Sequence, residues 1–245
     1  MNQAWVRHEV KYHVNAETLT NFRSYTERML RADPYSKPGV GYDNYSIYFD
    51  SPRLRYYREK EEGLEIRTKP RLRVYKRPED HAPLARYFEF KHRRGMMVAK
   101  ERTAISEGMA MRILDPHLHD RALFGSTDSV LQKLWYLNRR YDLKPVVCVL
   151  YRREAFTCPY FPGVRITFDR LLTASSRITL DTAPSQFQAI LPSNETVIEV
   201  KFNSNMPTWL VHTAQRLELK RVSLSKYVTA IRAPALGWPK ELLQE

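Results

Sequence analysis

Hydrophobic and polar residues alternate along much of the chain, which is the pattern of β-strands that bury one face. The segment KPRLRVYKR shows it clearly: Arg71, Arg73 and Tyr75 fall on one face, and Leu72 and Val74 fall on the other. The apolar face predicts a buried core on that side. We expect strands wherever the alternation recurs, in residues 4–14, 44–50, 69–77, 85–95, 97–105, 144–156, 163–174 and 196–203.

Helical periodicity in the remaining segments, together with capping residues, predicts several helices. Asn15 is the expected N-cap of the first helix, and Pro52 directly after Ser51 marks the start of the second. The strands and helices together favour an α+β fold dominated by an antiparallel sheet. The helices are expected at residues 15–32, 52–62, 107–114, 128–141, 206–219 and 223–231.

The sequence contains no linker that would divide it, so we predict one domain over residues 1–245, with a core of about residues 5–232 and a loose tail from Ala233. The charged N-terminus does not resemble a signal peptide, and no apolar run approaches the ~20 residues of a membrane helix. The two cysteines, Cys148 and Cys158, lack metal-ligand spacing. A reducing, cytoplasmic location is the expectation.

Basic residues outnumber acidic residues by 40 to 27, which gives a formal net charge of +13. Such a surplus predicts an anionic partner: a nucleic acid, a phosphorylated metabolite or a membrane surface. The basic residues of a nucleic-acid binder would spread over helices or loops. Here they alternate with carboxylates on strands, so we expect no nucleic-acid partner.

Seven predicted strands carry a charged face opposite a strongly apolar one. An ordinary sheet with its charges in water is one interpretation. The other is a closed barrel with a charged lumen and with helices packed on its apolar outside. Most of the charged residues are Arg, or Glu and Lys two positions apart, which favours the barrel and a polyanion inside it. The charged faces are Arg7, Glu9, Lys11; Arg71, Arg73, Tyr75; Glu89, Lys91, Arg93; Lys100, Arg102; Tyr151, Arg153; Arg165, Thr167, Asp169; and Glu199, Lys201.

Nine short motifs carry a resemblance to a known family. RHEVKY, YFDSP, RLRVY, FEFKHRR, AKER, LYRREAF, RITFD, IEVKF and SLSKY occur in this order. Together they resemble the VTC domain, the polyphosphate polymerase domain of vacuolar transporter chaperone proteins and their stand-alone bacterial relatives. That family belongs to the triphosphate tunnel metalloenzymes of the CYTH-like superfamily. The resemblance implies a β-barrel tunnel that transfers the γ-phosphoryl of ATP to a growing polyphosphate chain and releases ADP.

The resemblance also implies roles for individual residues. Glu199 matches the metal ligand, for Mn²⁺ or Mg²⁺, and the catalytic set would be Lys11, Arg73, Arg153 and Glu199. Ser225 and Lys226, near a helix start, would add phosphate contacts. The full set expected to bind ATP and polyphosphate is Arg7, Lys11, Arg71, Arg73, Lys91, Lys100, Arg102, Arg153, Arg165, Lys201, Ser225 and Lys226.

Several acidic residues have simpler explanations than metal binding or catalysis. Glu9 and Glu89 are expected to balance neighbouring Lys and Arg, and Asp169 to pair with Arg165 or another tunnel base. The DPHLHD segment, residues 115–120, is more readily a polar loop than a metal cluster.

The reaction itself remains open on the sequence. A tripolyphosphatase or nucleoside triphosphatase on the same scaffold is the first alternative, and a non-catalytic polyphosphate-binding module is the second. Hydrolase relatives usually show an E-x-E-x-K strand, whereas this chain has Arg7, Glu9 and Lys11. Arg7 thus stands where the hydrolases have the first glutamate. This change favours binding of more phosphate and fewer metal ions, and hence the polymerase. No glycine-rich phosphate loop is present, so side chains must bind the phosphates. A membrane partner protein also remains open.

Overall fold

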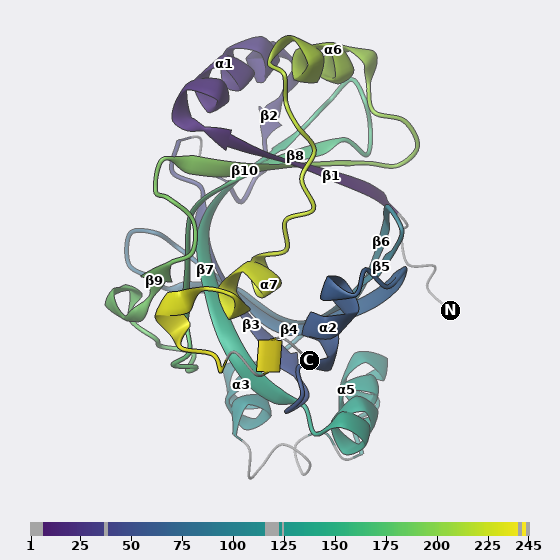
Figure 1. The fold of residues 1–245 in the computed structure, drawn as a ribbon, viewed down its shortest axis with the longest axis vertical. Coiled ribbons are helices and arrows are strands. Elements are labelled where there is room, and N and C mark those ends of the chain that lie inside the picture. Colours follow the sequence, from purple (N-terminus) through teal and green to yellow (C-terminus); the bar gives the residue numbers. More distant parts are fainter. Residues whose placement is uncertain (1–6, 37–38, 116–122, 124, 240–241, 244–245) are drawn as a thin grey trace.

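The computed structural model describes residues 7–36, 39–115, 123, 125–239 and 242–243. Ten antiparallel strands form one sheet in the order β2-β7-β3-β4-β5-β6-β1-β10-β8-β9, and an additional pairing of β7 with β8 closes it. Eight of the strands therefore make a closed barrel, with β2 and β9 as short additions (Figure 1). The predicted α+β barrel is confirmed.

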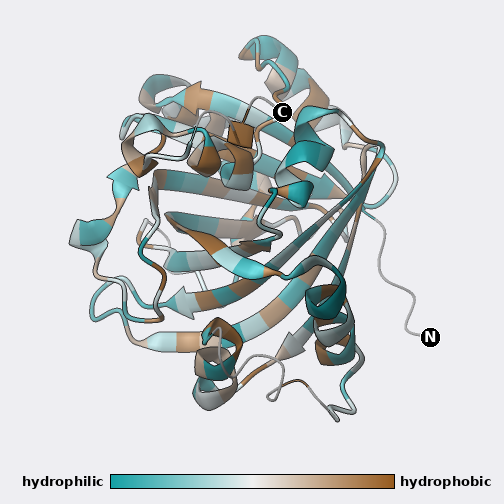
Figure 2. Cartoon of the chain, turned by 60° about the horizontal axis from the view of Figure 1, so that its bottom comes forward, coloured by the Kyte–Doolittle hydropathy of each residue, from teal (hydrophilic) through white to brown (hydrophobic). Residues whose placement is uncertain are grey.

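The long strands follow the segments in which the sequence alternates (Figure 2). The seam between β1 and β6 has the shortest register of the barrel, with two residue pairs, Arg7 with Val98 and His8 with Met97. The strands are β1 Arg7–Asn15, β2 Arg31–Ala32, β3 Tyr42–Asp50, β4 Ile66–Lys76, β5 Pro83–Arg94, β6 Met97–Ala104, β7 Lys144–Thr157, β8 Arg165–Ser175, β9 Gln188–Ala189 and β10 Glu195–Phe202.

Four helices cover the outside of the barrel: α1 (Ala16–Thr26) and α6 (Thr208–Arg216) on one side, and α3 (Glu107–Leu114) and α5 (Ser129–Tyr141) on the other (Figure 1). The outward apolar faces of the strands meet them in two cores. Leu72, Phe88 and Phe90 pack with Ile113 and Leu134 in the core under α3 and α5. Burying each such side chain contributes about 1.5–3 kcal/mol relative to exposure, so the apolar faces hold the helices on the outside.

Two short helices depart from the expected outside position. In Figure 1 helices α2 (Arg55–Glu61) and α7 (Lys226–Ile231) lie over the opening of the ring of strands and not on its outer side. Lumen-facing residues from β7 and β10, among them Val149, Tyr151 and Val197, form a third core with Tyr227 and Ile231 of α7. One part of the lumen face is therefore apolar, because α7 packs on it.

The starts of these two helices differ from their predicted starts. The Asp50 carboxylate accepts hydrogen bonds from the backbone nitrogens of Tyr56 and Tyr57, at 2.9 and 3.0 Å, and from the Tyr227 hydroxyl. With Leu54 in the left-handed region (φ 53°), this capping delays α2 to Arg55 rather than Pro52. The N-cap of α7 is Ser225 and not Ser223, which brings Lys226 into the first turn.

The chain passes close to the barrel wall at Gly41. Its φ is +71°, and a Cβ there would lie 2.3 Å from the carbonyl oxygen of Arg153, so only glycine fits. None of the helices among the described residues is long and apolar enough to cross a membrane. Residues 116–120 of the predicted polar loop lie outside the described residues.

Candidate functional site

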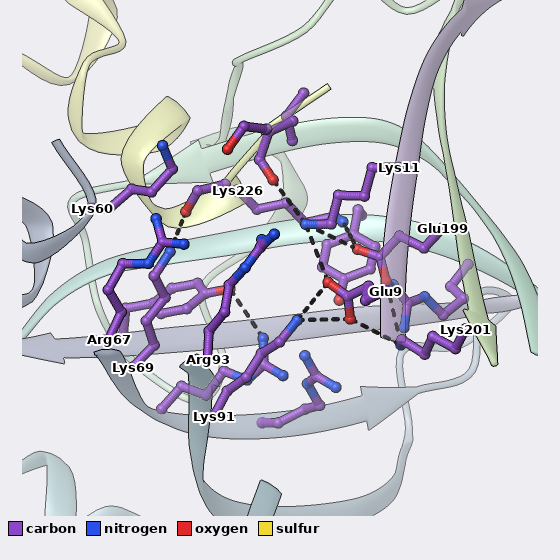
Figure 3. Close-up of a pocket in the computed structure, with 18 residues that line it drawn as sticks. Glu9, Lys11, Lys60, Arg67, Lys69, Lys91, Arg93, Glu199, Lys201 and Lys226 are labelled. Carbon is purple, nitrogen blue, oxygen red and sulfur yellow. Dashed lines mark hydrogen bonds and ion pairs between the residues drawn. The ribbon is translucent and has the colours of Figure 1, made fainter. Parts of the chain in front are cut away.

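A pocket of about 80 Å³ occupies the charged part of the lumen (Figure 3). Eleven basic residues and two carboxylates line it, with two tyrosines, two serines and a leucine. The lining residues are Glu9, Lys11, Tyr48, Lys60, Arg67, Lys69, Arg71, Arg73, Lys91, Arg93, Tyr151, Arg153, Glu199, Lys201, Ser223, Leu224, Ser225 and Lys226.

Glu199 of β10 lies among four cations. One carboxylate oxygen accepts a hydrogen bond from Lys226 Nζ at 2.9 Å and lies 3.5 Å from Lys11 Nζ. The other accepts from Arg153 at 3.1 Å and lies 3.4 Å from Lys201 Nζ. Burial alone would raise the pKa of Glu199, but the surrounding cations hold it well below its usual range. The carboxylate is therefore ionised and acts as the counter-ion of the inner lumen.

Asp169 of β8 completes this inner cluster. Arg153 donates to both of its oxygens, at 2.5 and 2.6 Å, and Lys226 Nζ lies 2.6 Å away. Both Arg153 and Lys226 have a raised pKa despite their burial, because Asp169 and Glu199 stabilise their charged forms. Asp169 thus pairs with a tunnel base other than Arg165, one of the two outcomes expected from the sequence.

Glu9 and Glu89 neutralise basic side chains on β4 and β5. Glu9 accepts two hydrogen bonds from Lys91, at 2.8 and 2.9 Å, and lies 3.7 Å from Lys11. Glu89 accepts from Arg71 Nε at 2.5 Å and lies 3.6 Å from Arg73. Burial would raise the pKa of each carboxyl, but the cations lower it instead. Their contacts match the charge-balancing role expected for both.

Four further cations, Lys60, Arg67, Lys69 and Arg93, gather at the side of the pocket near α2 and α7 (Figure 3). In the described part of the chain they form no ion pair with a carboxylate. Lys69 instead donates to the Ser225 hydroxyl at 2.5 Å, and burial together with neighbouring cations holds its pKa well below the usual range. Among the described residues, this group therefore lacks the carboxylate partners that the inner cations have.

The four lining cations on this side were not among the predicted phosphate-binding residues. Arg67 and Lys69 continue the alternation of Arg71 and Arg73 along β4, so the pattern itself could have indicated them. Arg93 lies on the charged face already recognised in β5. Lys60 belongs to α2, and only the position of that helix against the lumen brings it into the site.

Nine of the thirteen candidate residues line this pocket: Lys11, Arg71, Arg73, Lys91, Arg153, Glu199, Lys201, Ser225 and Lys226. The other four lie away from it. Lys100 Nζ is 3.9 Å from the Glu89 carboxylate, and the Arg102 guanidinium carbon lies over the Tyr87 ring, 4.5 Å from its centroid. Arg165 pairs with Asp33 at 2.9 Å, and Arg7 lies at the β1–β6 seam. Strand alternation placed these residues on the lumen face but not at the pocket.

A divalent cation fits this site only together with phosphate. No group of three or more His, Cys, Asp or Glu residues within the described ranges could hold a metal. Glu199 offers oxygen ligands of the right kind, yet four cations surround it. Mg²⁺ is commonly held by one or two carboxylates plus substrate phosphates, and phosphate oxygens would also offset the repulsion from the surrounding cations.

The comparisons with known proteins agree with a tunnel barrel. The sequence model of the VTC domain family matches residues 6–234. No curated protein matches the chain significantly.

Among solved structures, the chain is similar to a candidate adenylate cyclase from Bacillus halodurans, at 13% identity, a TM-score of 0.52 and coverage of 89% of this chain and 95% of that one. It is also similar to the PH1819 protein of Pyrococcus horikoshii, at 14% identity, a TM-score of 0.49 and coverage of 91% and 96%. A third similar structure is the Mimivirus capping enzyme triphosphatase, at 10% identity, a TM-score of 0.39 and coverage of 88% of each chain. The first similarity supports the fold alone.

Proposed function

The chain belongs to the VTC domain family, whose sequence model covers residues 6–234, and on this basis we propose that it is a polyphosphate polymerase. It would transfer the γ-phosphoryl of ATP to the end of an inorganic polyphosphate chain and release ADP. The observation that carries the proposal is a closed lumen with eleven basic side chains, where the buried carboxylates are already paired with cations. We also propose that it acts in the cytoplasm.

Phosphoryl transfer requires two phosphates held in line and neutralisation of their oxygens, more than it requires a covalent nucleophile. Arg153, Lys226 and Lys11 would hold the transferred phosphoryl group, since all three converge on Glu199. Arg73 and Lys91 would hold adjoining phosphates of the chain. A Mn²⁺ or Mg²⁺ ion bound by Glu199 and phosphate oxygens would offset charge on the leaving diphosphate.

The proposal is tested by incubating the purified protein with ATP and Mn²⁺ and resolving the products on a gel stained for polyphosphate. The expected result is a ladder of polymer that a polyphosphatase removes. ADP should be released in proportion to the phosphate that enters the polymer. Free phosphate without polymer would instead establish a triphosphatase, and tight polyphosphate binding without turnover would establish an accessory module.

Binding of polyphosphate should weaken as the pH rises. Burial lowers the pKa of Lys201 to about 8, although Glu199 and Glu9 oppose the shift. A bound polyanion would raise this pKa again, so binding takes up a proton above pH 8. Between pH 7 and pH 9 this one lysine would raise the Kd for tripolyphosphate by about tenfold.

The comparison variant is Lys201→Arg, whose guanidinium stays protonated over this range. Titration of the ligand itself is the same for both proteins, so it cancels in the comparison. Calorimetry in two buffers of different ionisation enthalpy measures the proton uptake directly. Equal pH dependence in the wild type and the variant would contradict a role for Lys201 in binding.

A further inference from the structure

Asp50, the last residue of β3, carries a fully buried carboxylate outside the tunnel pocket. It accepts hydrogen bonds from the backbone nitrogens of Ser51, Tyr56 and Tyr57, at 2.7, 2.9 and 3.0 Å. The Tyr227 hydroxyl donates a further bond at 2.5 Å. Capping of α2 explains the bonds from that helix. The bond from Tyr227 joins residues far apart in the chain, so it needs another explanation.

Tyr227 carries this contact to the cations of the tunnel. It directly follows Lys226 in α7, and its ring stacks on the Tyr48 ring, with 5.0 Å between the centroids and 25° between the planes. Tyr48 lines the tunnel pocket, and its hydroxyl accepts a hydrogen bond from Arg71 at 3.2 Å. Asp50 is therefore connected to a basic residue of β4 through two aromatic rings, and to Lys226 through one residue of helix.

The same carboxylate joins the two helices that lie over the opening of the barrel (Figure 1). A second tie reinforces the first. Arg232, at the C-cap of α7, is engaged by the Glu61 carboxylate of α2 and donates to the Tyr57 hydroxyl at 3.2 Å. The helix α2 brings Lys60 to the pocket, and α7 brings Lys226. The two helices thus form one unit that is anchored to the end of β3.

Lys226 depends on a fixed helix because its side chain is long and flexible. Its ammonium group lies 2.9 Å from the Glu199 carboxylate and 2.6 Å from that of Asp169. A bound phosphate would compete with both carboxylates for this ammonium group. The position of the Lys226 backbone then decides which phosphate oxygens the ammonium group can reach.

We propose that Asp50 is a positioning residue: through Tyr227 it fixes the first turn of α7, and with it the Lys226 ammonium group that contacts phosphate. Asp50 itself would not contact the phosphates. The inference rests on the proposed function for its effect on turnover, because a misplaced ammonium group would slow phosphoryl transfer. Its effect on phosphate binding is the same whichever reaction follows.

Two variants break this connection at different atoms. Tyr227→Phe removes the hydroxyl and keeps the ring that stacks on Tyr48. Asp50→Asn keeps the size of the side chain but places an amide nitrogen where a carboxylate oxygen accepted hydrogen bonds. Tyr45→Phe is the matched control, since Tyr45 is buried on the same strand but packs in the core under α3 and α5. Binding of inorganic tripolyphosphate is measured by calorimetry in EDTA, so that nothing turns over.

Each variant is also made together with Lys226→Gln, which removes the charge but keeps N–H donors for the two carboxylate partners. We expect Tyr227→Phe and Asp50→Asn each to raise the Kd for tripolyphosphate by about tenfold in the wild type. In the Lys226→Gln background the same changes should raise it by less than about twofold, because the residue that they position is gone. The control should leave the Kd unchanged in both backgrounds.

Thermal melts first establish that each variant is folded at the assay temperature, and Tyr227→Phe, the milder change, decides the test if Asp50→Asn is unfolded. A lower melting temperature with an unchanged Kd would overturn the positioning role, and so would equal effects in the two backgrounds. A wild type that binds tripolyphosphate but forms no polymer would overturn the polymerase alone, since the Kd values still test Asp50. Failure of the wild type to bind tripolyphosphate would overturn both.

Discussion

Glu199→Gln is expected to abolish metal-dependent turnover and, at the same time, to tighten binding of tripolyphosphate in the absence of metal. The carboxylate would supply the metal ligand, so its loss should lower kcat by at least about 10³-fold. It also competes with phosphate for Lys226, Arg153, Lys11 and Lys201. Without that competition the cations are free to bind the ligand, and the Kd should fall several-fold.

The same substitution should destabilise the empty protein. Removing one partner of a buried charge cluster costs about 3–5 kcal/mol, and tripolyphosphate should restore much of the loss in thermal melts. Glu195→Gln is the control, since Glu195 lies on the same strand and pairs with His13 outside the pocket, at 2.6 Å. Strong metal-dependent turnover in Glu199→Gln would place the metal ligand elsewhere.

Arg153→Ala is expected to lower kcat by about 10²–10³-fold, the usual effect of losing a positioned donor at the reacting centre. It should weaken tripolyphosphate binding as well. The side chain bridges Asp169 and Glu199, so its removal leaves Asp169 with Lys226 as its remaining cation. Steady-state kinetics and calorimetry measure the two effects separately.

Arg153→Lys separates this loss from a loss of folding. It keeps the charge but cannot reproduce the two parallel bonds to Asp169. We expect a folded protein whose turnover is still at least about tenfold lower, because one ammonium cannot replace the guanidinium fork. Arg152→Lys is the matched control. Arg152 makes the same kind of double contact, to Asp43, on the opposite face of β7. Equal kinetics in the two Lys variants would argue against a tunnel role for Arg153.

Strand alternation was sufficient to assign the two faces of most strands, whereas the closed barrel was favoured by the kind of charged residues and by the resemblance to the VTC domain. In β5, for example, Phe88 and Phe90 must face a core, which leaves Glu89 and Lys91 on the other side. The alternation also oriented Glu199 and Lys201 in β10. For these strands the period of two residues contains all the information needed to assign a face.

The same pattern could not show how far along the barrel a residue lies. Arg165 and Arg102 have the expected orientation, but the tilt of the strands carries them away from the pocket. In residues 146–150 of β7 both faces are apolar, so nothing in the sequence indicated that Val149 supports a helix in the lumen. Lys60 was missed for a related reason: tertiary contacts of α2, not its own sequence, turn it towards the pocket.

The charge of the lumen has a consequence for the order in which ligands arrive. Eleven basic residues line the pocket against two lining carboxylates, and Glu89 and Asp169 pair with some of the same cations, so an excess of fixed positive charge remains in the lumen. Such a compartment excludes small mobile cations and enriches anions, as a fixed-charge gel does at Donnan equilibrium. Free Mn²⁺ or Mg²⁺ would therefore be depleted inside. The metal ion would enter the barrel bound to the nucleotide, as a complex with a net negative charge. A single anion would then bring both the phosphates and the cation that offsets their charge.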